Sequence, residues 1–463
     1  MTEKRDDRMS SKAKQYEIDM CSGPILRKML LFALPLMLSS ILQLLFNAAD
    51  IVVVGKFAGD NSLAAVGSNT ALINLLTNLF IGLSIGANVV AARSYGAKAW
   101  DDLKRTVHTS MLLSMVSGLL LMVVGVVGAK QMLIWMQTPR EVLPLATVYL
   151  RIYFLGMAST MVYNFGSALL RAVGDTKRPL YFLLCAGVIN VILNLLFVIG
   201  FHLDVMGVAI ATVISETVSA VLVLRCLMRE SGGIHLELRA MQIDRKKMMQ
   251  ILRIGLPAGF QGVVFALSNV VIQSSVNIFG NIIVAGNSAA ANLEGFVYMA
   301  MNAFYQTTLS FVSQNFGAGE QKRIHRIVLW GEICVIVTGT LLGNAVVFFG
   351  NELLQIYSNN PEVITAGMVR LHYISMVYAL CGIMDVMVGA LRGIGYSIMP
   401  MIVSIVGVCV LRLVWLATVF QIPQFHRIET VYLSYPFTWI LTSIVYIVFF
   451  ICVRVKTCRK QHS

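Results

Sequence analysis

Long apolar stretches alternate with short polar segments along almost the whole chain. Twelve of these stretches are long enough to cross a membrane as helices, which takes about 20 residues at a rise of 1.5 Å per residue. Helices satisfy their own backbone hydrogen bonds at that depth, and the alternating segments of about ten residues that make a membrane β-barrel are absent here. The sequence therefore predicts an all-α membrane protein. The expected spans cover 25–50, 62–91, 106–128, 142–165, 180–200, 206–228, 248–278, 287–312, 324–349, 362–389, 399–420 and 431–453.

The composition agrees with this class of protein. Hydrophobic residues make up 57% of the chain and charged residues 13%, whereas soluble domains average about 45–50% and about 25%. The eight cysteines form no CxxC pair and mostly fall within spans, so neither disulfides nor a zinc site is expected. A phosphate-binding loop, HExxH and GxSxG are all missing. The sequence therefore predicts that the protein is not an enzyme and has no cofactor.

The basic residues are distributed unevenly between the two sides of the membrane. The net charge is +13, and 29 of the 36 lysines and arginines fall on one side of the expected spans. By the positive-inside rule that side is the cytoplasm, and this placement argues against a nucleic-acid partner. Both termini are then cytoplasmic, and an N-terminus without an apolar core predicts no cleaved leader. We expect a monomeric, multi-pass protein of the plasma (inner) membrane, with membrane lipids around it.

The chain also contains an internal duplication. LRAVGDTKRP at 170–179 and LRGIGYSIMP at 391–400 share Leu, Arg, Gly and Pro at matching positions. Each copy holds six spans, and because six is even, both copies have the same orientation in the membrane. The expected architecture is two six-helix lobes related by a pseudo-two-fold axis along the membrane normal, with a central cavity between them. Further matches at nearly the same offset are Pro35 with Pro257, Asn47 with Asn269 and Gly96 with Gly317.

A polar segment at 229–250 divides the two copies, and the apolar pattern restarts after it. The predicted order is a cytoplasmic tail (1–23), an N-terminal lobe (24–235), a cytoplasmic inter-lobe loop (236–250), a C-terminal lobe (251–456) and a second cytoplasmic tail (457–463).

Four sequence segments form a specific combination in their order and spacing. They are FNAADIVVVG (46–55), GVAIATVIS (207–215), SQNFGAGE (313–320) and the LRAVGD/LRGIG pair. Together they resemble the multidrug and toxic compound extrusion (MATE) transporters. The resemblance covers about residues 24–455. It implies a secondary antiporter that expels organic, often cationic compounds in exchange for inward H⁺ or Na⁺.

Polar residues inside the N-terminal spans are the first candidates for a functional site. An acidic residue at the centre of a span costs ~2.5–3.5 kcal/mol, so it should face a cavity or a partner. Asp50 lies in the first span, while Asn190 and Asn194 lie four residues apart, on one face of the fifth. The resemblance implies that these residues, with Thr212 of the sixth span, form a cation site. Asn194 departs from the family pattern, which commonly has Asp there.

The loss of one carboxylate bears on the coupling ion. A lone buried carboxylate can carry a proton at physiological pH, because desolvation disfavours its charged form. A Na⁺ site would prefer more negative oxygens, although amide and hydroxyl oxygens are usable ligands. The sequence therefore leans toward H⁺ and leaves Na⁺ open. The two asparagines also fit simple interhelical hydrogen bonds, Asp50 a capping position, and Glu216, four residues after Thr212, a structural role.

The C-terminal lobe has a less regular set of candidates for a cavity wall: Glu294, Asp385, Asn269 and Arg412. Asp385 lies seven residues before Arg392, about two helical turns, so a local ion pair is the alternative. Arg412 falls inside a span and must reach the surface or find an acid. Some family members carry a Glu where this chain has Phe265. The resemblance thus leaves a C-lobe cation site in doubt.

Pro35 and Pro257 occupy matching positions in the first and seventh spans. Each removes a backbone hydrogen bond and can kink its helix. Either a static kink or a hinge fits. As a hinge, Pro35 would let protonation of Asp50 bend the first helix and displace substrate outward.

Two other functions stay open from the sequence. A flippase for a lipid-linked precursor would favour a strongly cationic cavity, but buried acids outnumber buried arginines here. A membrane-embedded enzyme would need clustered ligands or a nucleophile with its base, and the seven histidines are scattered.

Overall fold

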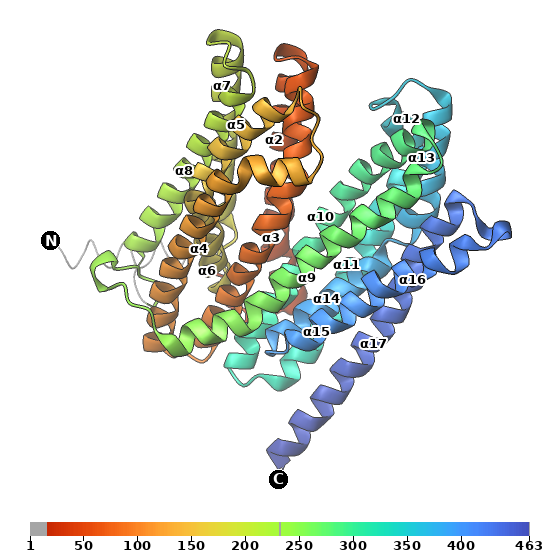
Figure 1. Ribbon diagram of the computed structural model, residues 1–463. Helices are drawn as coiled ribbons and strands as arrows, with labels where there is room; N and C mark the ends of the chain where they lie inside the picture. The colour runs from red at the N-terminus through yellow and green to blue at the C-terminus, as the bar shows by residue number, and fades with distance from the viewer. Residues whose placement is uncertain (1–15, 231–232, 463) are drawn as a thin grey trace. The chain divides into compact units, whose positions relative to one another are not determined.

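The computed structural model describes residues 16–230 and 233–462, with the backbone alone at 60 and 455–462. Within these residues the chain is helical and contains no strand (Figure 1). The predicted all-α class is confirmed. The helices are α2 (Ile25–Phe57), α3 (Asp60–Gly96), α4 (Trp100–Trp135), α5 (Leu143–Leu155), α6 (Met157–Ala172), α7 (Lys177–Leu195), α8 (Asp204–Arg229), α9 (Arg245–Asn277), α10 (Asn281–Gly317), α11 (Gln321–Phe348), α12 (Gly350–Gln355), α13 (Pro361–Ile374), α14 (Ala379–Gly393), α15 (Ile398–Ser404), α16 (Leu411–Ala417) and α17 (Ile428–His462).

Every expected span coincides with a helix, a bent pair of helices or a helix continued by π-turns. Among the described residues, nine helices are long and apolar enough to cross a membrane, and up to eleven when each bent pair counts as one span. The one remaining expected span, 287–312, corresponds to α10, which falls outside this set. Its many polar side chains, such as Asn287 and Gln314, are buried against protein, so α10 does not need an apolar surface for lipid.

Two spans that the sequence predicts as single helices are bent. α5 and α6 meet at Gly156 with an angle of 46°, and the helix ending at Val377 meets α14 with the same angle of 46°. Hydropathy continues across both bends, so an apolar pattern alone does not reveal them. The equal angles at equivalent places reflect the duplication.

Backbone conformation repeats at two further pairs of positions. Gly174 and Gly395, in the duplicated phrase, both have a φ of +99°, a left-handed conformation that favours glycine. Lys98 and Gly319, in the turns before α4 and α11, have φ values of +55° and +78°. The duplicated sequence therefore folds into duplicated turns.

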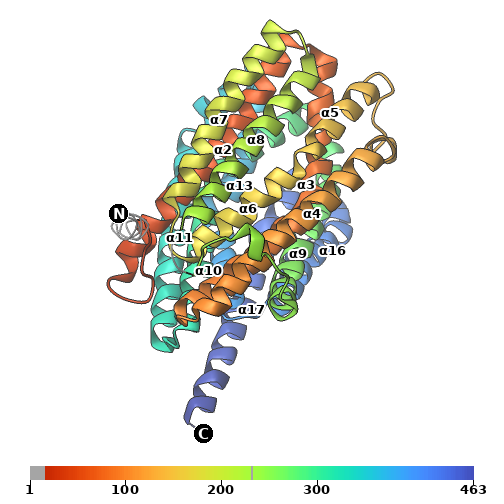
Figure 2. The same ribbon diagram turned by 90° about the vertical axis from the view of Figure 1, so that its left-hand side faces the viewer.

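The described residues form two compact units. One comprises residues up to 22, 34–262 and 313–319, and the other comprises 23–33, 263–312 and 320 onward. In the first unit α6 packs against α3, α4 and α8 (Figure 2). In the second, α14 packs against α11 and α17. The helices α2, α9 and α10 contribute to both units.

Glycines explain why the first half of α9 belongs to the first unit. A Cβ on Gly82 of α3 would lie 2.2 Å from the backbone nitrogen of Gly259, and one on Gly255 would lie 2.6 Å from the Cα of Leu83. Small residues four apart let two membrane helices approach to backbone contact. One turn further along α3, a Cβ on Gly86 would lie 2.3 Å from the backbone oxygen of Ile251 and 3.0 Å from the backbone nitrogen of Gly255, so the close contact continues there.

The two ends of the chain give little evidence on which side of the membrane the termini lie. Lys4, Arg5, Arg8, Lys12 and Lys14 lie outside the described residues, and α17 continues through most of the predicted C-terminal tail. Cytoplasmic termini, the domain boundaries and the central cavity stay predictions.

Candidate functional site

Four polar side chains of the first unit form one hydrogen-bonded chain. Asn194 on α7 donates from Nδ2 to the carboxylate of Asp50 on α2, and to Asn190 Oδ1 at 3.1 Å. Asn190 in turn donates to Thr212 Oγ1 on α8 at 3.4 Å. The sequence predicts this set as an N-lobe cation site, and the structure brings all four residues together. Their part in ion coupling stays a prediction.

Helical spacing and one glycine position this polar chain. Asn190 and Asn194 lie one turn apart on α7, and both are buried. A Cβ on Gly187 would lie 1.9 Å from the ring of Phe46, which is one turn before Asp50 on α2. The missing side chain at Gly187 thus lets α2 and α7 approach closely enough for Asp50 to reach Asn194.

The polar chain contains a free acceptor. Asn194 Oδ1 is buried and has no hydrogen-bond partner among the described residues, although the Nδ2 of the same amide donates twice. Together with the half-buried carboxylate of Asp50 it offers oxygen atoms to a proton or a hard cation. The described residues contain no group of three His, Cys, Asp or Glu side chains that could hold a metal ion.

A second carboxylate lies near the first. Glu216 on α8 accepts a hydrogen bond from Thr160 Oγ1 of α6. Tyr149 and Tyr153 on α5 interact electrostatically with both Glu216 and Asp50, and their rings stack at 6.0 Å. Sequence reasoning missed Thr160 and both tyrosines. For the two tyrosines, the signal in the sequence was their spacing of four residues within one apolar span.

In the second unit, Glu294 is held in a buried ion pair. Arg370 on α13 binds it with two hydrogen bonds, Nη2 to Oε2 at 2.7 Å and Nε to Oε1 at 3.1 Å. Arg370 also donates to Asn287 Oδ1 at 2.7 Å, which accepts from Tyr432 at 3.3 Å. Arg370 is 8% exposed. Sequence reasoning did not identify it as the partner of Glu294.

The other C-lobe candidates have different surroundings. Asp385 accepts a hydrogen bond from Tyr298 and interacts electrostatically with Arg392, while its Oδ2 has no hydrogen-bond partner in the described part of the chain. Arg412 donates to Thr438 at 3.0 Å and lies 3.9 Å from the ring centre of Tyr435.

No ion pair joins Arg412 to a carboxylate within residues 16–230 and 233–454. Asn269 is exposed on α9, with no hydrogen bond to this cluster among the side chains that the structure describes.

One buried acid escaped sequence reasoning altogether. Glu332 lies in α11, and neither of its carboxylate oxygens has a hydrogen-bond partner among the described residues. An acidic residue inside the expected span 324–349 was the signal that the sequence offered.

The prolines lie within unbroken helices. α2 continues through Pro35 and α9 through Pro257. Ser39 donates to the backbone oxygen of Pro35 at 2.8 Å. A hinge at either proline stays a prediction.

A family model, MatE, matches the chain twice, at residues 35–196 and 257–418. The chain belongs to the MATE family. This confirms the predicted family, the duplication and a transporter rather than an enzyme. Each matched copy begins at one of the two equivalent prolines, Pro35 and Pro257.

Known proteins are similar to this MATE transporter over most of their length. The probable multidrug resistance protein YoeA of Bacillus subtilis is 27% identical over 386 residues, which is 82% of this chain and 83% of the relative. A protein named FAD transporter from Shewanella oneidensis is 26% identical over 443 residues, 94% of this chain and 97% of the relative. These two names differ in the chemistry of the cargo.

Solved structures show the fold of this MATE transporter. A multidrug resistance MATE family transporter of the MOP superfamily, in an outward-facing conformation, matches with a TM-score of 0.89 at 20% identity. The match covers 95% of this chain and 98% of that one. The MATE fold is therefore shared although four residues in five differ.

Proposed function

We propose that this chain is a secondary antiporter that exports drug-like compounds, mainly organic cations, in exchange for an inward-moving H⁺. The multidrug name of YoeA supports a broad range of substrates. The observation that carries the proposal is the hydrogen bond from Asn194 to Asp50, which links one carboxylate to two amides and a hydroxyl inside a membrane lobe. The protein is proposed to act as a monomer in the plasma membrane with both termini in the cytoplasm.

The composition of the polar chain supports H⁺ as the coupling ion. A proton needs one carboxylate, and Asp50 is the single acid in the chain of four residues. Na⁺ binding would require several oxygen ligands turned toward one point. Here the Asn194 nitrogen, a donor, faces Asp50.

Protonation has a direct consequence for these hydrogen bonds. A neutral Asp50 carries an O–H that needs an acceptor, and Asn194 Oδ1 is a buried acceptor with no partner among the described residues. Protonation therefore favours a rearranged contact in which Asp50 donates to Asn194 and the Nδ2 bond is released. Pro35 lies about four turns away on the same helix and gives α2 a place to bend.

The energy available from one proton is sufficient. Moving one charge across 100 mV provides ~2.3 kcal/mol, and a tenfold concentration ratio corresponds to ~1.4 kcal/mol. One proton per substrate thus supports more than a tenfold gradient of a neutral compound. Exchange of one proton for a singly charged organic cation moves no net charge, so the pH difference alone drives it, with ~1.4 kcal/mol for each pH unit.

The test uses purified protein in proteoliposomes, a fluorescent organic cation, and separately imposed H⁺ and Na⁺ gradients. Wild-type protein should accumulate the cation with the H⁺ gradient, and Asp50→Asn should lose this coupling. Asp101→Asn, an exposed acid at the start of α4, is the matched control and should behave as wild type. Full H⁺-coupled transport by Asp50→Asn would refute the proposal.

An anionic substrate is the second candidate, and Arg412 is the observation that favours it. Its guanidinium is buried, and no carboxylate pairs with it in the described part of the chain. A relative named FAD transporter supports cargo of this charge. FAD efflux that is lost in Arg412→Gln, without loss of organic-cation efflux, would support this candidate.

A further inference from the structure

We propose that residues 16–22 form a strap that holds the ends of α3, α6 and α10 together, and that this strap detaches in each transport cycle to open this side of the protein to cargo. The strap comes directly before α2 and belongs to the first unit. Met20 is its most deeply buried residue, while Asp19 and Ser22 are exposed. The proposal rests on the transport function proposed above, because only a protein that changes conformation needs such a strap to detach.

The strap packs against the duplicated phrase of the first copy. At Gly174, whose φ is +99°, a Cβ would lie 2.4 Å from the backbone oxygen of Ile18 and 2.6 Å from its backbone nitrogen. A residue without a side chain is therefore needed here for the strap to fit. The guanidinium of Arg178, four residues further on, lies 5.4 Å from the centre of the Tyr16 ring, a cation–π contact. The turn between α6 and α7 thus binds the strap both by close packing and by charge.

The end of α3 holds the strap through a hydrogen bond. The hydroxyl of Tyr95 donates to Glu17 Oε2 at 3.0 Å. A bond to a carboxylate is stronger than one between two neutral groups. The Tyr95 ring also packs edge-on against Trp100, with 5.6 Å between the ring centres. This contact fixes the direction in which the hydroxyl points.

The strap also binds the end of α10. Asn315 donates from Nδ2 to the backbone oxygen of Met20 at 3.0 Å. The thiol of Cys21 donates to Gln314 Oε1 at 4.0 Å. The amide of Gln314 in turn donates to the backbone oxygen of Ala172 at 2.6 Å. The strap therefore fastens the end of α10 to the turn that follows α6.

Next to the strap, the ends of α3 and α10 meet through equivalent glycines of the two copies. A Cβ on Gly96 would lie 2.0 Å from the backbone oxygen of Gln314. A Cβ on Gly317 would lie 2.1 Å from the backbone oxygen of Arg93. Small residues allow such backbone contact, and no side chain has to be withdrawn when it separates. The helix ends can therefore part and meet again, and the strap decides how readily they do so.

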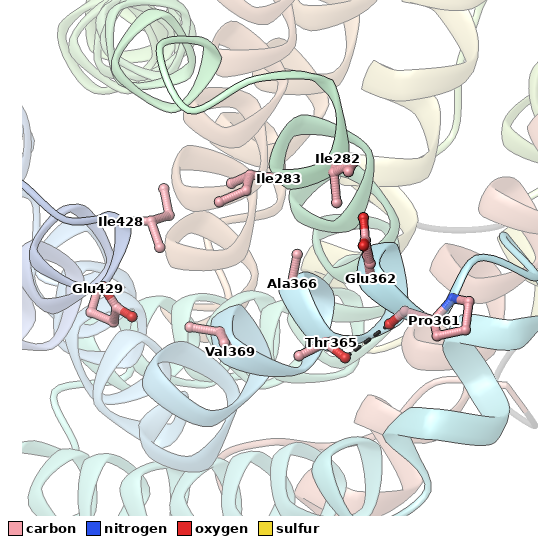
Figure 3. Close-up of a pocket in the computed structure, with 9 residues that line it drawn as sticks. All are labelled: Ile282, Ile283, Pro361, Glu362, Thr365, Ala366, Val369, Ile428 and Glu429. Atoms are coloured by element: carbon pink, nitrogen blue, oxygen red, sulfur yellow. Dashed lines mark hydrogen bonds between the residues drawn. The ribbon is translucent and has the colours of Figure 1, made fainter.

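The helix α10 connects this place with the second unit. It runs unbroken from Asn281 to Gly317, and its part up to residue 312 belongs to the second unit. Ile282 and Ile283, in its first turn, line a cavity of about 450 Å³ together with residues of α13 and α17 (Figure 3). A movement of α10 with the second unit would pull its last turn away from α3. The strap opposes this separation, because it binds the end of α10 and the turn after α6 at once.

The chain that leaves the strap also enters the second unit. At Gly23, where φ is +65°, it turns into α2, and residues 23–33 belong to the second unit. Asp50, further along α2, belongs to the first unit. A displacement of the start of α2 therefore pulls directly on the strap, as a displacement of α10 does.

In the second copy, the segment that matches the strap has a different position. At the offset of the two equivalent prolines, this segment is 238–244. It contacts α4, where the backbone nitrogen of Asp244 donates to Thr109 Oγ1 at 3.0 Å. A contact that the repeated fold itself requires would occur in both copies. The position of the strap is therefore a feature of the first copy and needs its own explanation.

The first experiment fixes the strap in place. Glu17→Cys with Tyr95→Cys, in a cysteine-free background, is bridged by a short bis-methanethiosulfonate reagent. Transport is measured in proteoliposomes as exchange of labelled for unlabelled tetraphenylphosphonium at equal pH on both sides. Bridged protein should exchange at least tenfold more slowly than untreated protein, because the strap can no longer detach. Dithiothreitol, which cleaves the bridge, should restore the rate.

Lys104→Cys with Glu237→Cys is the matched control. These two exposed side chains form an ion pair at 3.3 Å between α4 and the inter-lobe loop, so the same reagent can bridge them without involving the strap. Exchange should stay within twofold of the untreated rate. Glu17→Cys alone and Tyr95→Cys alone, treated with the reagent, should exchange no more slowly than before treatment.

The second experiment measures whether the strap detaches during transport. In Met20→Cys the new thiol replaces a fully buried side chain, while the backbone oxygen that binds Asn315 stays. N-ethylmaleimide should label this thiol at least threefold faster during cargo exchange than at rest. Ser22→Cys, which replaces an exposed residue, should be labelled equally fast in both conditions. Adding Tyr95→Phe to Met20→Cys should raise the rate at rest, because the bond to Glu17 is lost.

The proposal fails if bridged protein exchanges cargo like untreated protein, or if exchange leaves the labelling of Met20→Cys unchanged. Both measurements use exchange without an ion gradient, so they do not depend on which ion drives export. If a H⁺ gradient drives no transport in wild-type protein while bridging still stops exchange, the proposed coupling fails and the role of the strap stands.

Discussion

At the residue scale, Asn194 has a central role because its amide donates twice, to Asp50 and to Asn190. An aspartate at this position has no N–H donor and adds a negative charge beside Asp50. Asn194→Asp should therefore reduce H⁺-driven export about tenfold or more, since hydrogen bonds to a charged group contribute about 1.5–3 kcal/mol each. Added Na⁺ should restore part of the activity by bridging the two carboxylates. Transport in proteoliposomes with and without Na⁺ measures both effects.

Asn194→Leu is the matched control, because it removes the same donors without adding charge. It should lose H⁺-driven export and gain nothing from Na⁺. Equal responses of the two variants to Na⁺ would contradict the role given to the carboxylate.

The buried ion pair of Glu294 and Arg370 makes a prediction about stability. Glu294→Gln leaves the Arg370 guanidinium buried without its counter-charge, and breaking a buried pair in this way costs about 3–5 kcal/mol. Thermal unfolding in detergent should shift strongly downward. The exposed acid Glu352 gives the control, since Glu352→Gln should change stability by less than about 0.5 kcal/mol.

Removing both members of the pair separates charge from packing. Glu294→Gln combined with Arg370→Met should recover part of the lost stability, because no unpaired charge remains. If the double variant is less stable than Glu294→Gln alone, the unpaired guanidinium is not the source of the loss.

Residue patterns predicted the N-lobe chain better than the C-lobe cluster. Asn190 and Asn194, four apart on one helix, had to share a face, so their proximity followed from spacing. The Glu294–Arg370 pair joins residues 76 positions apart. Arg370 also lies near the end of α13, where an arginine in sequence looks like a surface charge. Which residues form such a pair depends on how the helices pack, and the sequence pattern does not show it.

At the element scale, the contact between α2 and α7 depends on Gly187. In an open helix position, Gly→Ala should stabilise by up to about 1 kcal/mol. At Gly187 the added Cβ would overlap the Phe46 ring, at 1.9 Å, so this ring must move. Because the ring lies where α2 meets α7, we expect α2 to shift with it and Asp50 to withdraw from Asn194. Gly187→Ala should therefore lose most coupled export, measured with the same H⁺ gradient.

Gly67→Ala on α3 is the matched control, because a Cβ there meets nothing within 4 Å. Adding Phe46→Leu to Gly187→Ala should restore export by making room for the methyl group. Wild-type export by Gly187→Ala alone would show that the close approach of the two helices is not needed.

Hydropathy predicted where helices occur but not how they bend. The expected spans 25–50, 106–128 and 431–453 lie inside α2, α4 and α17, which extend up to nine residues further at their ends. Hydropathy did not reveal the bends after Leu155 and Val377, since the apolar pattern continues through them. The membership of α10 in the protein interior likewise has no apolar signature. These features depend on contacts between helices.

At the scale of the whole molecule, the two copies of the repeat predict the orientation of the chain. The turn at Lys98 and the turn at Gly319 occupy equivalent places and share a left-handed backbone. Basic residues cluster beside both turns, which the positive-inside rule assigns to the cytoplasm. The loops that contain Gln137 and Asn359, at the other ends of α4 and α11–α12, should then face outward.

Cysteine labelling tests this orientation in both copies at once. In a cysteine-free background, a membrane-impermeant maleimide applied to intact cells should label Gln137→Cys and Asn359→Cys, which replace exposed residues. It should label Lys98→Cys and Gly319→Cys after the membrane is permeabilised and not before. Six spans per copy place the paired turns on one side, so labelling of Lys98→Cys and Gly319→Cys from opposite sides would exclude a parallel repeat. Outside labelling of both turns would instead reverse the orientation while keeping the repeat.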